Sequence, residues 1–350
     1  MTDPEPKPPR RPRYPGTHPR RFEQKYKELA PEKYPELVEH VRERGMTPAG
    51  QHVPILVEEV LAVLAPSAGE RGVDCTLGYG GHARRFLERL APNGTLLGLD
   101  VDPLELEKTE ARLRALGFGP DALVVRRTNF AGLGAAVFGL GWSDGADFVF
   151  ADLGVSSMQI DDPSRGFTFK ADGPLDMRMH PGKGLSAAEW LARTTREELE
   201  RALIEHADEP HAERLASALW LHNHELTTTR ALVDEVRRAL PPRLDEEEAT
   251  ASIRRVFQAL RIQVNDEFGA LDALLRQLPA CVRPGGRAAI LTFHSGEDRR
   301  VKHAFAAGVR DGVWSEVNDE VVRASAEERR ANPRSAPAKL RWVWRALAPA

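Results

Sequence analysis

The hydrophobic pattern in the first half of the chain alternates between two repeats. Short apolar runs predict buried strands at residues 71–78, 95–102, 122–130 and 146–157. Before and between the first three of them, apolar residues recur at helical spacing and predict helices over 52–66, 80–94 and 103–117. Strands that alternate with helices of this length predict a parallel sheet with right-handed crossovers.

From residue 160 the pattern changes. Residues 160–182 are rich in Gly, Pro and Asp and predict a loop, and residues 186–260 carry helical periodicity without a strand signal. A strand signal returns at 285–295, after a helix predicted over 265–282. We therefore predict an α/β fold, a Rossmann-like sheet with an inserted all-helical domain. The predicted parts are an N-terminal extension (1–50), the first part of the sheet domain (51–160), a helical substrate-recognition insertion (161–260) and the second part of the sheet domain with a C-terminal tail (261–350).

The N-terminal extension differs in composition from the rest. Proline and arginine crowd residues 1–21. Proline removes backbone donors and like charges repel, so we expect a disordered, extended basic tail. Two interpretations stay open, a solubilising tail and an arm that binds phosphates through its charge. Residues 22–44 fit a short helix that Pro31 and Pro35 interrupt.

The composition sets broad limits on the function. The chain has 350 residues, 41% hydrophobic and 29% charged, as in ordinary globular proteins. A formal net charge of −3 is not the basic footprint of a nucleic-acid-binding domain, so such a role must rest on local patches. No apolar run approaches about 18 residues, and the N-terminus lacks the apolar core of a signal peptide. Two cysteines, Cys75 and Cys281, cannot form a disulfide framework or a zinc site, so we expect them to be structural and the protein to be cytoplasmic.

A glycine-rich turn follows the first predicted strand. Its sequence, DCTLGYGGH over residues 74–82, places glycines where backbone must approach a ligand and where a helix offers free N–H groups. Asp100 ends the next strand, where a carboxylate can accept hydrogen bonds from both hydroxyls of a ribose. A dinucleotide and S-adenosylmethionine both fit this pattern, as does a turn without a ligand. Asp74 favours S-adenosylmethionine, because a carboxylate repels a pyrophosphate but attracts a sulfonium or amino group.

Two further strand ends carry candidate site residues. Asp152 follows the apolar segment FVFA (148–151) of the fourth predicted strand, and small and hydroxyl residues follow it up to Gln159. Ligands of open parallel sheets bind beyond the carboxyl ends of the strands, so this segment fits the floor of a pocket. An ordinary strand-to-loop cap has the same pattern. Phe130 ends the third predicted strand, where it faces either an adenine ring or the core.

Three other patterns carry less information. The run RGFTFKADGPLDMRM, residues 165–179, interleaves cations with aromatic residues, which suits an unstacked base as well as a flexible loop with a buried aromatic. His222 and His224 lie two positions apart, and no carboxylate–histidine set completes a metal site around them, so we expect solvated histidines and no metal. The acidic run 245–248 predicts a solvated turn.

Taken together, these segments resemble the bacterial 16S ribosomal RNA cytosine-N4 methyltransferases. The resemblance runs from about His52 to the C-terminus and leaves the N-terminal extension out. It rests on the motifs HVPIL, DCTLGYGGH, GLDVDP, DLGVSSMQIDDPSRGFTFKADGPLDMRM, VFQALRIQVNDE, GGRAAILTFHSGEDRRVK and NPRSAPAKLR. The family fold, a Rossmann-like class I methyltransferase sheet with an inserted helical domain, agrees with the fold predicted from the hydrophobic pattern.

The resemblance implies S-adenosylmethionine as the cofactor, with a set of donor contacts. The implied cofactor-binding residues are Gly80, Gly81, His82, Asp100, Phe130, Asp152 and Gln159. The backbone at 80–82 would cradle the methionine part, Asp100 would hold the ribose hydroxyls, and Phe130 would flank the adenine. Asp152 and Gln159 would lie nearer the methionine end and the acceptor base.

The implied reaction is direct methyl transfer to the exocyclic N4 of a decoding-site cytidine, at about position 1402 of 16S rRNA in the small ribosomal subunit, after the base leaves its stack. Asp152 is the candidate catalytic residue, as acceptor of an N4 proton. A backbone carbonyl is an alternative, and Ser156 and Ser157 are weaker candidates. The protein would be a monomer or a dimer and would bind no membrane. The helical insertion, the 165–179 loop and a set of basic residues would grip the RNA, namely Arg254, Arg255, Arg299, Arg300 and Lys302.

The chain departs from the family pattern at three places. Gly296 replaces the leucine of FHSLEDR, TASIRR (250–255) replaces a His-Pro-Ala-x-Arg stretch, and HADEP (206–210) replaces a Tyr-Gly-Glu-Glu stretch. Two alternatives therefore stay open beside the enzyme. One is a small-subunit assembly factor that keeps the donor pocket with little catalysis, and the other is a methyltransferase that acts on DNA or another RNA.

Overall fold

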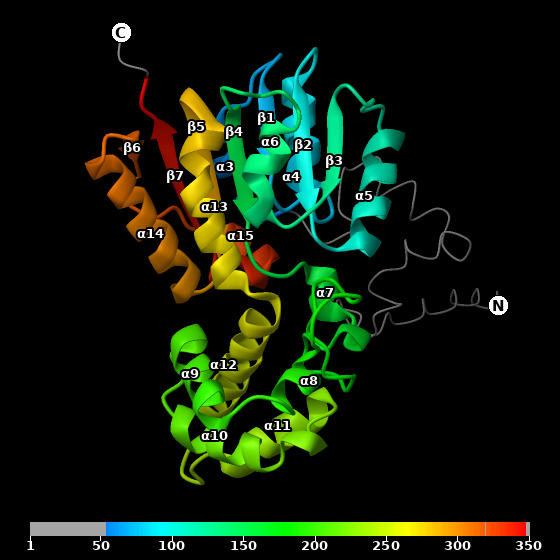
Figure 1. Ribbon diagram of the computed structural model, residues 1–350, viewed down its shortest axis with the longest axis vertical. Helices are drawn as coiled ribbons and strands as arrows, with labels where there is room; N and C mark the ends of the chain where they lie inside the picture. The colour runs from blue at the N-terminus through cyan, green and yellow to red at the C-terminus, as the bar shows by residue number, and fades with distance from the viewer. Residues whose placement is uncertain (1–53, 319, 348–350) are drawn as a thin grey trace, which may run out of the picture. The chain divides into compact units, whose positions relative to one another are not determined.

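The computed structural model describes residues 54–318 and 320–347. The predictions for residues 1–44 and for His52 lie outside these residues. Within them a seven-stranded sheet has the order β3-β2-β1-β4-β5-β7-β6 (Figure 1). β1 to β5 run parallel, and β7 is antiparallel to both of its neighbours. The strands are β1 (Arg71–Asp74), β2 (Thr95–Asp100), β3 (Leu123–Arg127), β4 (Ala146–Asp152), β5 (Val282–Thr292), β6 (Trp314–Val317) and β7 (Lys339–Arg345).

The order of the strands reverses at β1. β1 pairs with β2 on one side and with β4 on the other. In open α/β sheets a ligand binds at such a switch point, beyond the carboxyl ends of the strands. The three strands β1, β2 and β4 end in Asp74, Asp100 and Asp152, so the topology brings three carboxylates to this edge.

Helices cover both faces of the sheet (Figure 1). β4 shows why two cores form, because successive side chains of a strand point to opposite faces. Phe148 and Phe150 join a core with α3, α4 and α5, whereas Val149 joins a core with α6, α13 and α14. The helices of these layers are α3 (Val57–Leu64), α4 (Gly81–Leu90), α5 (Pro103–Ala115), α6 (Leu133–Phe138), α13 (Glu267–Cys281) and α14 (Ser295–Arg310).

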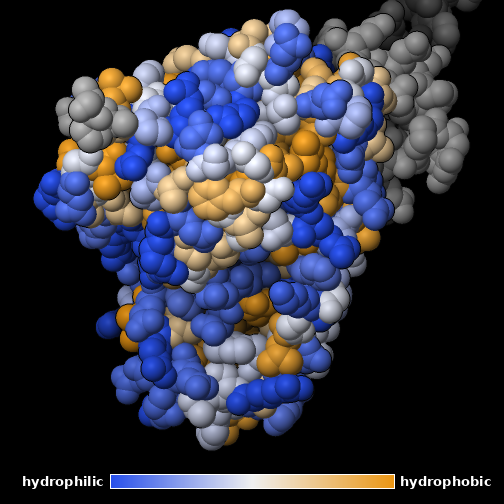
Figure 2. All heavy atoms as spheres, turned by 45° about the horizontal axis from the view of Figure 1, so that its top comes forward, coloured by the Kyte–Doolittle hydropathy of each residue, from blue (hydrophilic) through white to orange (hydrophobic). Residues whose placement is uncertain are grey.

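A helical part lies between β4 and β5 in the chain and has its own hydrophobic core. Its helices are α8 (Ala187–Leu191), α9 (Arg196–Ala207), α10 (Ala212–Leu221), α11 (Thr229–Ala239) and α12 (Glu246–Asn265). Figure 2 shows mostly hydrophilic side chains on the drawn face of this part. The predicted fold class is confirmed. The boundaries at 160 and 260 stay a prediction, because both parts belong to one compact unit that begins at Val53.

Short elements complete the described chain. They are α7 (Ser157–Asp161), α15 (Ala326–Ala331) and the 3-10 helices η2 (Phe130–Gly132), η3 (Pro163–Arg165), η4 (Asn223–Glu225) and η5 (Pro333–Ser335). Across residues 54–318 and 320–347, no helix combines the length and the apolar character that crossing a membrane requires.

Two local predictions are corrected by the structure. The acidic run 245–248 is not a solvated turn but the start of α12, because Asp245 and Glu248 form a capping box and acidic residues favour a helix N-terminus. The third strand ends at Arg127 rather than Phe130, since Asn129 accepts a hydrogen bond from Ala131 N and starts η2.

Candidate active site

Three carboxylates gather at the carboxyl ends of neighbouring strands. Asp74 is 1% exposed, and burial together with the charge of Asp100 raises its pKa to about 7 against the hydrogen bonds from Thr76. Burial also raises the pKa of Asp100. Burial, then the charges of Asp74 and Glu297, raise the pKa of Asp152 to about 8, while 29% of its side-chain surface stays exposed. Mutual repulsion and burial thus destabilise the charged carboxylates, and a cationic ligand at this edge would relieve both effects.

The turn after β1 holds Asp100 in place. Asp100 Oδ2 accepts a hydrogen bond from Gly78 N at 2.7 Å, and its Oδ1 accepts one from Asp102 N at 2.9 Å. Each oxygen of an ionised carboxylate has a further lone pair, so Asp100 can also accept bonds from two adjacent hydroxyls. This arrangement fits the ribose role of Asp100, which stays a prediction.

The glycines of the 74–82 turn allow close packing. Gly80 has a φ of 74°, and a Cβ there would lie 2.9 Å from Thr109 Cγ2. A Cβ at Gly81 would lie 2.2 Å from Pro54 Cγ. Side chains at these two positions would displace the turn, so the glycines fix its shape. Their contact with the methionine part of the donor stays a prediction.

His82 and Asp152 lie side by side. His82 Nδ1 is 3.7 Å from Asp152 Oδ2, and His82 Nε2 is 3.0 Å from Ile55 O. Burial lowers the pKa of His82 to about 4, against the hydrogen bond to Ile55, which raises it. The imidazole is therefore neutral near pH 7. Its Nε2–H donates to Ile55 O, and its Nδ1 lone pair is left on the side of Asp152.

Thr76 connects the ends of β1 and β4. Its Oγ1 accepts a hydrogen bond from Asp152 N at 2.7 Å, and its N–H donates to Asp74 Oδ1 at 3.0 Å. Both cysteines are buried nearby in the core, as their predicted structural role requires. Burial raises the pKa of each thiol, that of Cys281 to about 11, so neither offers a ready thiolate.

Phe130 lies where η2 begins and packs against the core shared with α6 and α13 while staying half-buried. The structure therefore supports the interpretation that Phe130 packs on the core, and its contact with an adenine ring stays a prediction.

Gln159 holds together two segments of the site. It is 8% exposed, its Nε2 donates to Asp102 Oδ2 at 2.9 Å, and its Oε1 accepts from Ser156 N at 2.9 Å. Ser156 Oγ in turn accepts from Gln159 N at 3.2 Å and closes a capping box at α7. The hydroxyl of Ser156 thus has a structural partner, and the donor contact of Gln159 stays a prediction.

Asp102 is a site residue that sequence reasoning missed. It is 1% exposed, and its Oδ1 caps α5 by accepting from Leu104 N at 3.0 Å. Its Oδ2 accepts from Gln159 Nε2 and from Arg165 Nη1, each at 2.9 Å. An aspartate directly before Pro103 was a visible cap signal, but the two long-range contacts leave no mark in the local sequence.

The 165–179 loop turns its apolar side chains inward. Phe169 packs on the helical core with its ring centroid 5.6 Å from that of Phe257, and Met177 is fully buried. Arg165 is 12% exposed in its side chain and faces a buried carboxylate. Of the two interpretations of this run, the structure favours the loop with buried aromatics over a stacking surface for RNA.

The basic residues expected to grip RNA have different surroundings. Arg255 and Arg299 lie near carboxylates just after α9, and the guanidinium of Arg300 lies 3.7 Å from the centre of an aromatic ring. Arg254 and Lys302 are exposed. The RNA roles stay predictions, and the last two residues are the better placed for contact with phosphates.

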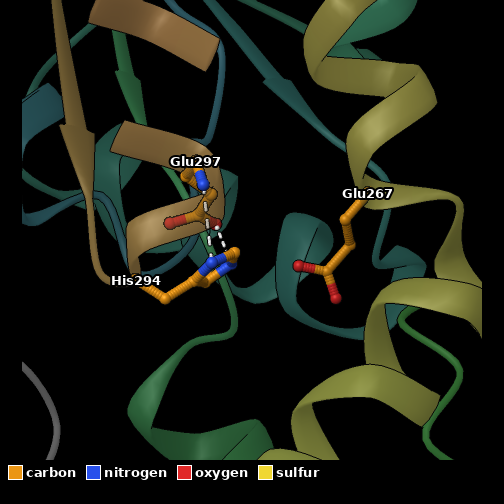
Figure 3. Close-up of side chains that lie close together, drawn as sticks. All are labelled: Glu267, His294 and Glu297. Atoms are coloured by element: carbon orange, nitrogen blue, oxygen red, sulfur yellow. Dashed lines mark hydrogen bonds and ion pairs between the residues drawn. The ribbon is translucent and has the colours of Figure 1, made fainter. Parts of the chain in front are cut away.

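Glu267, His294 and Glu297 form a compact polar cluster that the sequence analysis missed, because Glu267 is far from the other two in the chain. Figure 3 shows His294 and Glu297 facing Glu267 across a short gap. Their ligand atoms lie within 4.8 Å of one another, close enough to share one metal ion. Arg261 already donates to both oxygens of Glu267, at 2.7 and 2.9 Å. Glu297 accepts from a backbone N–H and lies 3.2 Å from His294 Nε2, which makes no hydrogen bond with any described residue, so the two carboxylates have partners within the protein and that imidazole nitrogen does not.

Known proteins match the chain over most of its length. The model of the MraW methylase family matches residues 49–346. Ribosomal RNA small subunit methyltransferase H 1 of Lachnoclostridium phytofermentans is 49% identical over 343 residues, covering 96% of this chain and 93% of the relative. The protein of the same name from Agathobacter rectalis is 48% identical over 343 residues, covering 96% and 97%.

These matches set the extent of the resemblance and establish the family. The family model begins at residue 49, as expected from the resemblance, whereas the alignments with these two relatives cover 96% of the chain and so also include part of the fifty-residue N-terminal extension. The family match also spans the whole sheet, the ends of β1, β2 and β4 that carry the three carboxylates, and the helical part. This chain therefore belongs to the MraW methylase family.

Proposed function

We propose that this chain methylates the exocyclic N4 of a decoding-site cytidine, at about position 1402 of 16S rRNA. The chain belongs to a methylase family, and its relatives are named as small-subunit rRNA methyltransferases, so methyl transfer to rRNA is the activity to explain. The observation that carries the finer proposal is Asp152, a partly exposed carboxylate with a raised pKa at the end of β4. Small-subunit rRNA is a cytoplasmic substrate, in keeping with the location expected from the sequence.

The methyl donor of this family is S-adenosylmethionine, and the strand-end site fits it. When bound, S-adenosylmethionine supplies an electrophilic methyl group on a positively charged sulfur. Asp74 and Asp152 provide the negative surroundings that favour such a charge, because burial and mutual repulsion otherwise raise their pKa values. Asp100 has free lone pairs for the ribose hydroxyls, at the end of the neighbouring strand β2.

Asp152 serves as the proton acceptor. A positive charge close to its carboxylate would lower the pKa of Asp152 from about 8 and so favour the ionised form, which can accept a hydrogen bond from N4–H. Transfer of the methyl group would leave N4 with an extra bond and a positive charge, and Asp152 would take the proton that N4 then releases. With no cation left beside it, Asp152 would return to its raised pKa of about 8 and would keep the proton.

His82 supports this step without taking part in the proton transfer. Its pKa of about 4 makes it a poor proton acceptor near pH 7. Its ring packs on Phe150, with centroids 4.7 Å apart, and its Nδ1 lies 3.7 Å from Asp152 Oδ2, so the ring covers one side of that carboxyl group. The lone pair of cytosine N4 is delocalised into the ring, so alignment of N4 with the methyl group supplies most of the rate enhancement.

Methyl transfer from labelled S-adenosylmethionine tests the proposal. The substrates are unmethylated small ribosomal subunits and naked 16S rRNA, and mass mapping locates the product. We expect one N4 methyl in the decoding region with the wild-type protein. Asp152→Asn should abolish transfer while donor binding persists, and Asp144→Asn, which removes an exposed carboxylate paired with Arg71, should transfer like the wild type.

The alternatives give different results in the same assay. Donor binding without transfer to any RNA would favour the assembly-factor alternative. A product in DNA, or in another RNA that competes with 16S rRNA, would favour the third interpretation. A methyl group on a carbon atom of the base, or on a ribose, would refute the N4 assignment and the role of Asp152 with it.

A further inference from the structure

Asp102 lies between two sides of the proposed site. One is the end of β2, where the methyl donor would bind, and the other comprises α7 and the 165–179 loop. One oxygen of Asp102 caps α5, and the other accepts hydrogen bonds from Gln159 and from Arg165. The residue is 1% exposed, and a buried polar side chain is stable only with hydrogen-bond partners of this kind. Within the described residues, Asp102 is the one carboxylate within ion-pair distance of Arg165.

The side of the junction that faces the methyl donor is the end of β2. Asp102 N donates to Asp100 Oδ1 at 2.9 Å, and Gly78 N donates to Asp100 Oδ2 at 2.7 Å. A ribose that binds Asp100 therefore engages a carboxylate that already fixes the backbone at Asp102. Because the next peptide units belong to α5, Asp102 cannot shift without disturbing the cap of that helix.

The acceptor side of the junction comprises α7 and the 165–179 loop. Arg165 Nη2 donates to the carbonyl oxygens of Arg178 and Met179, at 3.1 and 3.0 Å, and so ties the two ends of the loop together. Met177 N donates to Arg165 O at 3.0 Å and closes the same ring. The guanidinium that holds the loop closed is thus itself held by Asp102.

Gln159 makes the second connection to Asp102. Its amide bridges Asp102 to the first residue of the α7 capping box, Ser156. α7 follows directly after the β4 end that carries Asp152. A single buried oxygen, Asp102 Oδ2, therefore links both acceptor-side segments to the donor-side strand end.

We propose that Asp102 is a positioning residue for the methyl transfer. It sets α7 and the 165–179 loop relative to Asp100, so that donor binding at β2 favours one arrangement of the loop, whose expected contact with RNA needs no base stacked on its buried aromatic rings. The inference rests on the proposed function, in which Asp100 holds the donor ribose. Linkage makes the effect reciprocal, since a donor that strengthens RNA binding is itself bound more tightly when RNA is present.

The test compares two variants with the wild type. Asp102→Asn keeps an oxygen for the α5 cap but loses the charge that holds Arg165. Arg165→Gln leaves the cap untouched and so tests the link even where Asp102→Asn folds poorly. Asp144→Asn is the matched control, because it breaks an Asp–Arg pair outside the site. S-adenosylhomocysteine serves as the donor-side ligand, so that no reaction occurs during binding.

Three quantities are measured on each full-length protein. The first is the Kd of S-adenosylhomocysteine by calorimetry. The second is the Kd of unmethylated small subunits with and without saturating S-adenosylhomocysteine. The third is hydrogen exchange of the backbone amides in residues 165–179, again with and without the ligand. Exchange reports on the loop without any RNA, so it tests the link independently of the RNA substrate.

In the wild type we expect S-adenosylhomocysteine to tighten RNA binding at least fivefold and to slow exchange in the loop. In Asp102→Asn and in Arg165→Gln, the tightening should fall below twofold and the slowing should disappear, while the Kd of S-adenosylhomocysteine changes less than threefold. The double variant should match Asp102→Asn, because the bond between Asp102 and Arg165 is already lost in that single variant.

Other outcomes overturn the inference. Wild-type coupling and exchange in either variant would show that Asp102 does not connect the two sides. A loss of S-adenosylhomocysteine affinity beyond tenfold in Asp102→Asn would assign the residue to the donor site itself. Failure of the proposed function looks different, because the wild-type protein would then methylate no small-subunit RNA even where the ligand slows exchange in the loop.

Discussion

Replacing Gly296 by leucine restores the family motif FHSLEDR but should destabilise this protein. Gly296 is the second residue of α14, and a Cβ placed there would lie 2.6 Å from Phe268 Cζ. Phe268 is 5% exposed, and the guanidinium of Arg300 lies 3.7 Å from the centre of its ring. A leucine at position 296 therefore overlaps a packed ring that cannot move without losing its cation.

The magnitude follows from three contributions. Overpacking a core costs about 1–3 kcal/mol. Loss of the cation–π contact costs about 0.5–2 kcal/mol. Replacing a glycine within a helix raises the free energy of unfolding by about 0.5–1 kcal/mol. We expect Gly296→Leu to lower the free energy of unfolding by about 2.5 kcal/mol.

Urea unfolding measures this change, with the midpoint and the slope fitted together. Phe268→Leu makes room, so the double variant Gly296→Leu/Phe268→Leu should recover at least about 1 kcal/mol relative to additivity. Gly119→Leu is the control, because a Cβ there meets no atom within 4 Å, and its effect should stay within about 0.5 kcal/mol. A Gly296→Leu variant as stable as the wild type, or strictly additive effects in the double variant, would refute the steric argument.

Three further predictions concern the site and its support. Asp100→Ala should weaken binding of S-adenosylhomocysteine more than tenfold, about 1.4 kcal/mol by calorimetry, because the ribose acceptor is lost. In the unliganded protein, folded Asp152 holds its proton more tightly than the unfolded chain, with a pKa raised from 3.8 to about 8. The free energy of unfolding should therefore fall as pH rises through this range, and less steeply in Asp152→Asn, as urea unfolding at each pH would measure. Arg261→Met should cost about 3–5 kcal/mol of stability in the same assay, because Glu267 is left buried without its cation.

Each of these predictions has a contradicting result. Unchanged affinity in Asp100→Ala would remove that residue from the ribose site. An unchanged pH slope in Asp152→Asn would mean that its carboxyl titrates normally; Asp74, with a pKa of about 7, keeps part of the slope in either case. For Arg261→Met the control is Arg261→Met/Glu267→Met. The double variant should be more stable than Arg261→Met alone. The opposite order would show that Glu267 needs no partner.

The sequence by itself determined the alternation of strands and helices, and with it the fold class. Hydrophobic periodicity is a local property, so it was visible without coordinates. The same locality placed Asp74, Asp100 and Asp152 at strand ends, and parallel strands bring such ends to one edge. The resemblance to a methyltransferase family added the cofactor, and the family match agrees with it.

Local patterns were less reliable where one residue type serves two purposes. The acidic run 245–248 looked like a solvated turn, yet the same residues cap and begin α12. The 165–179 loop looked like a stacking surface as much as a buried loop, since aromatic residues suit both. The choice depends on whether a partner core lies opposite, which neighbouring residues do not reveal.

Only the tertiary structure decided which polar groups meet in the interior. Asp102 joins Gln159 and Arg165 across more than fifty residues of chain. The cluster around Glu267 and the packing of Gly296 on a ring of α13 likewise join distant segments. A buried charge or a close contact is stable only with its partner in place, and that pairing arises when the whole chain has folded.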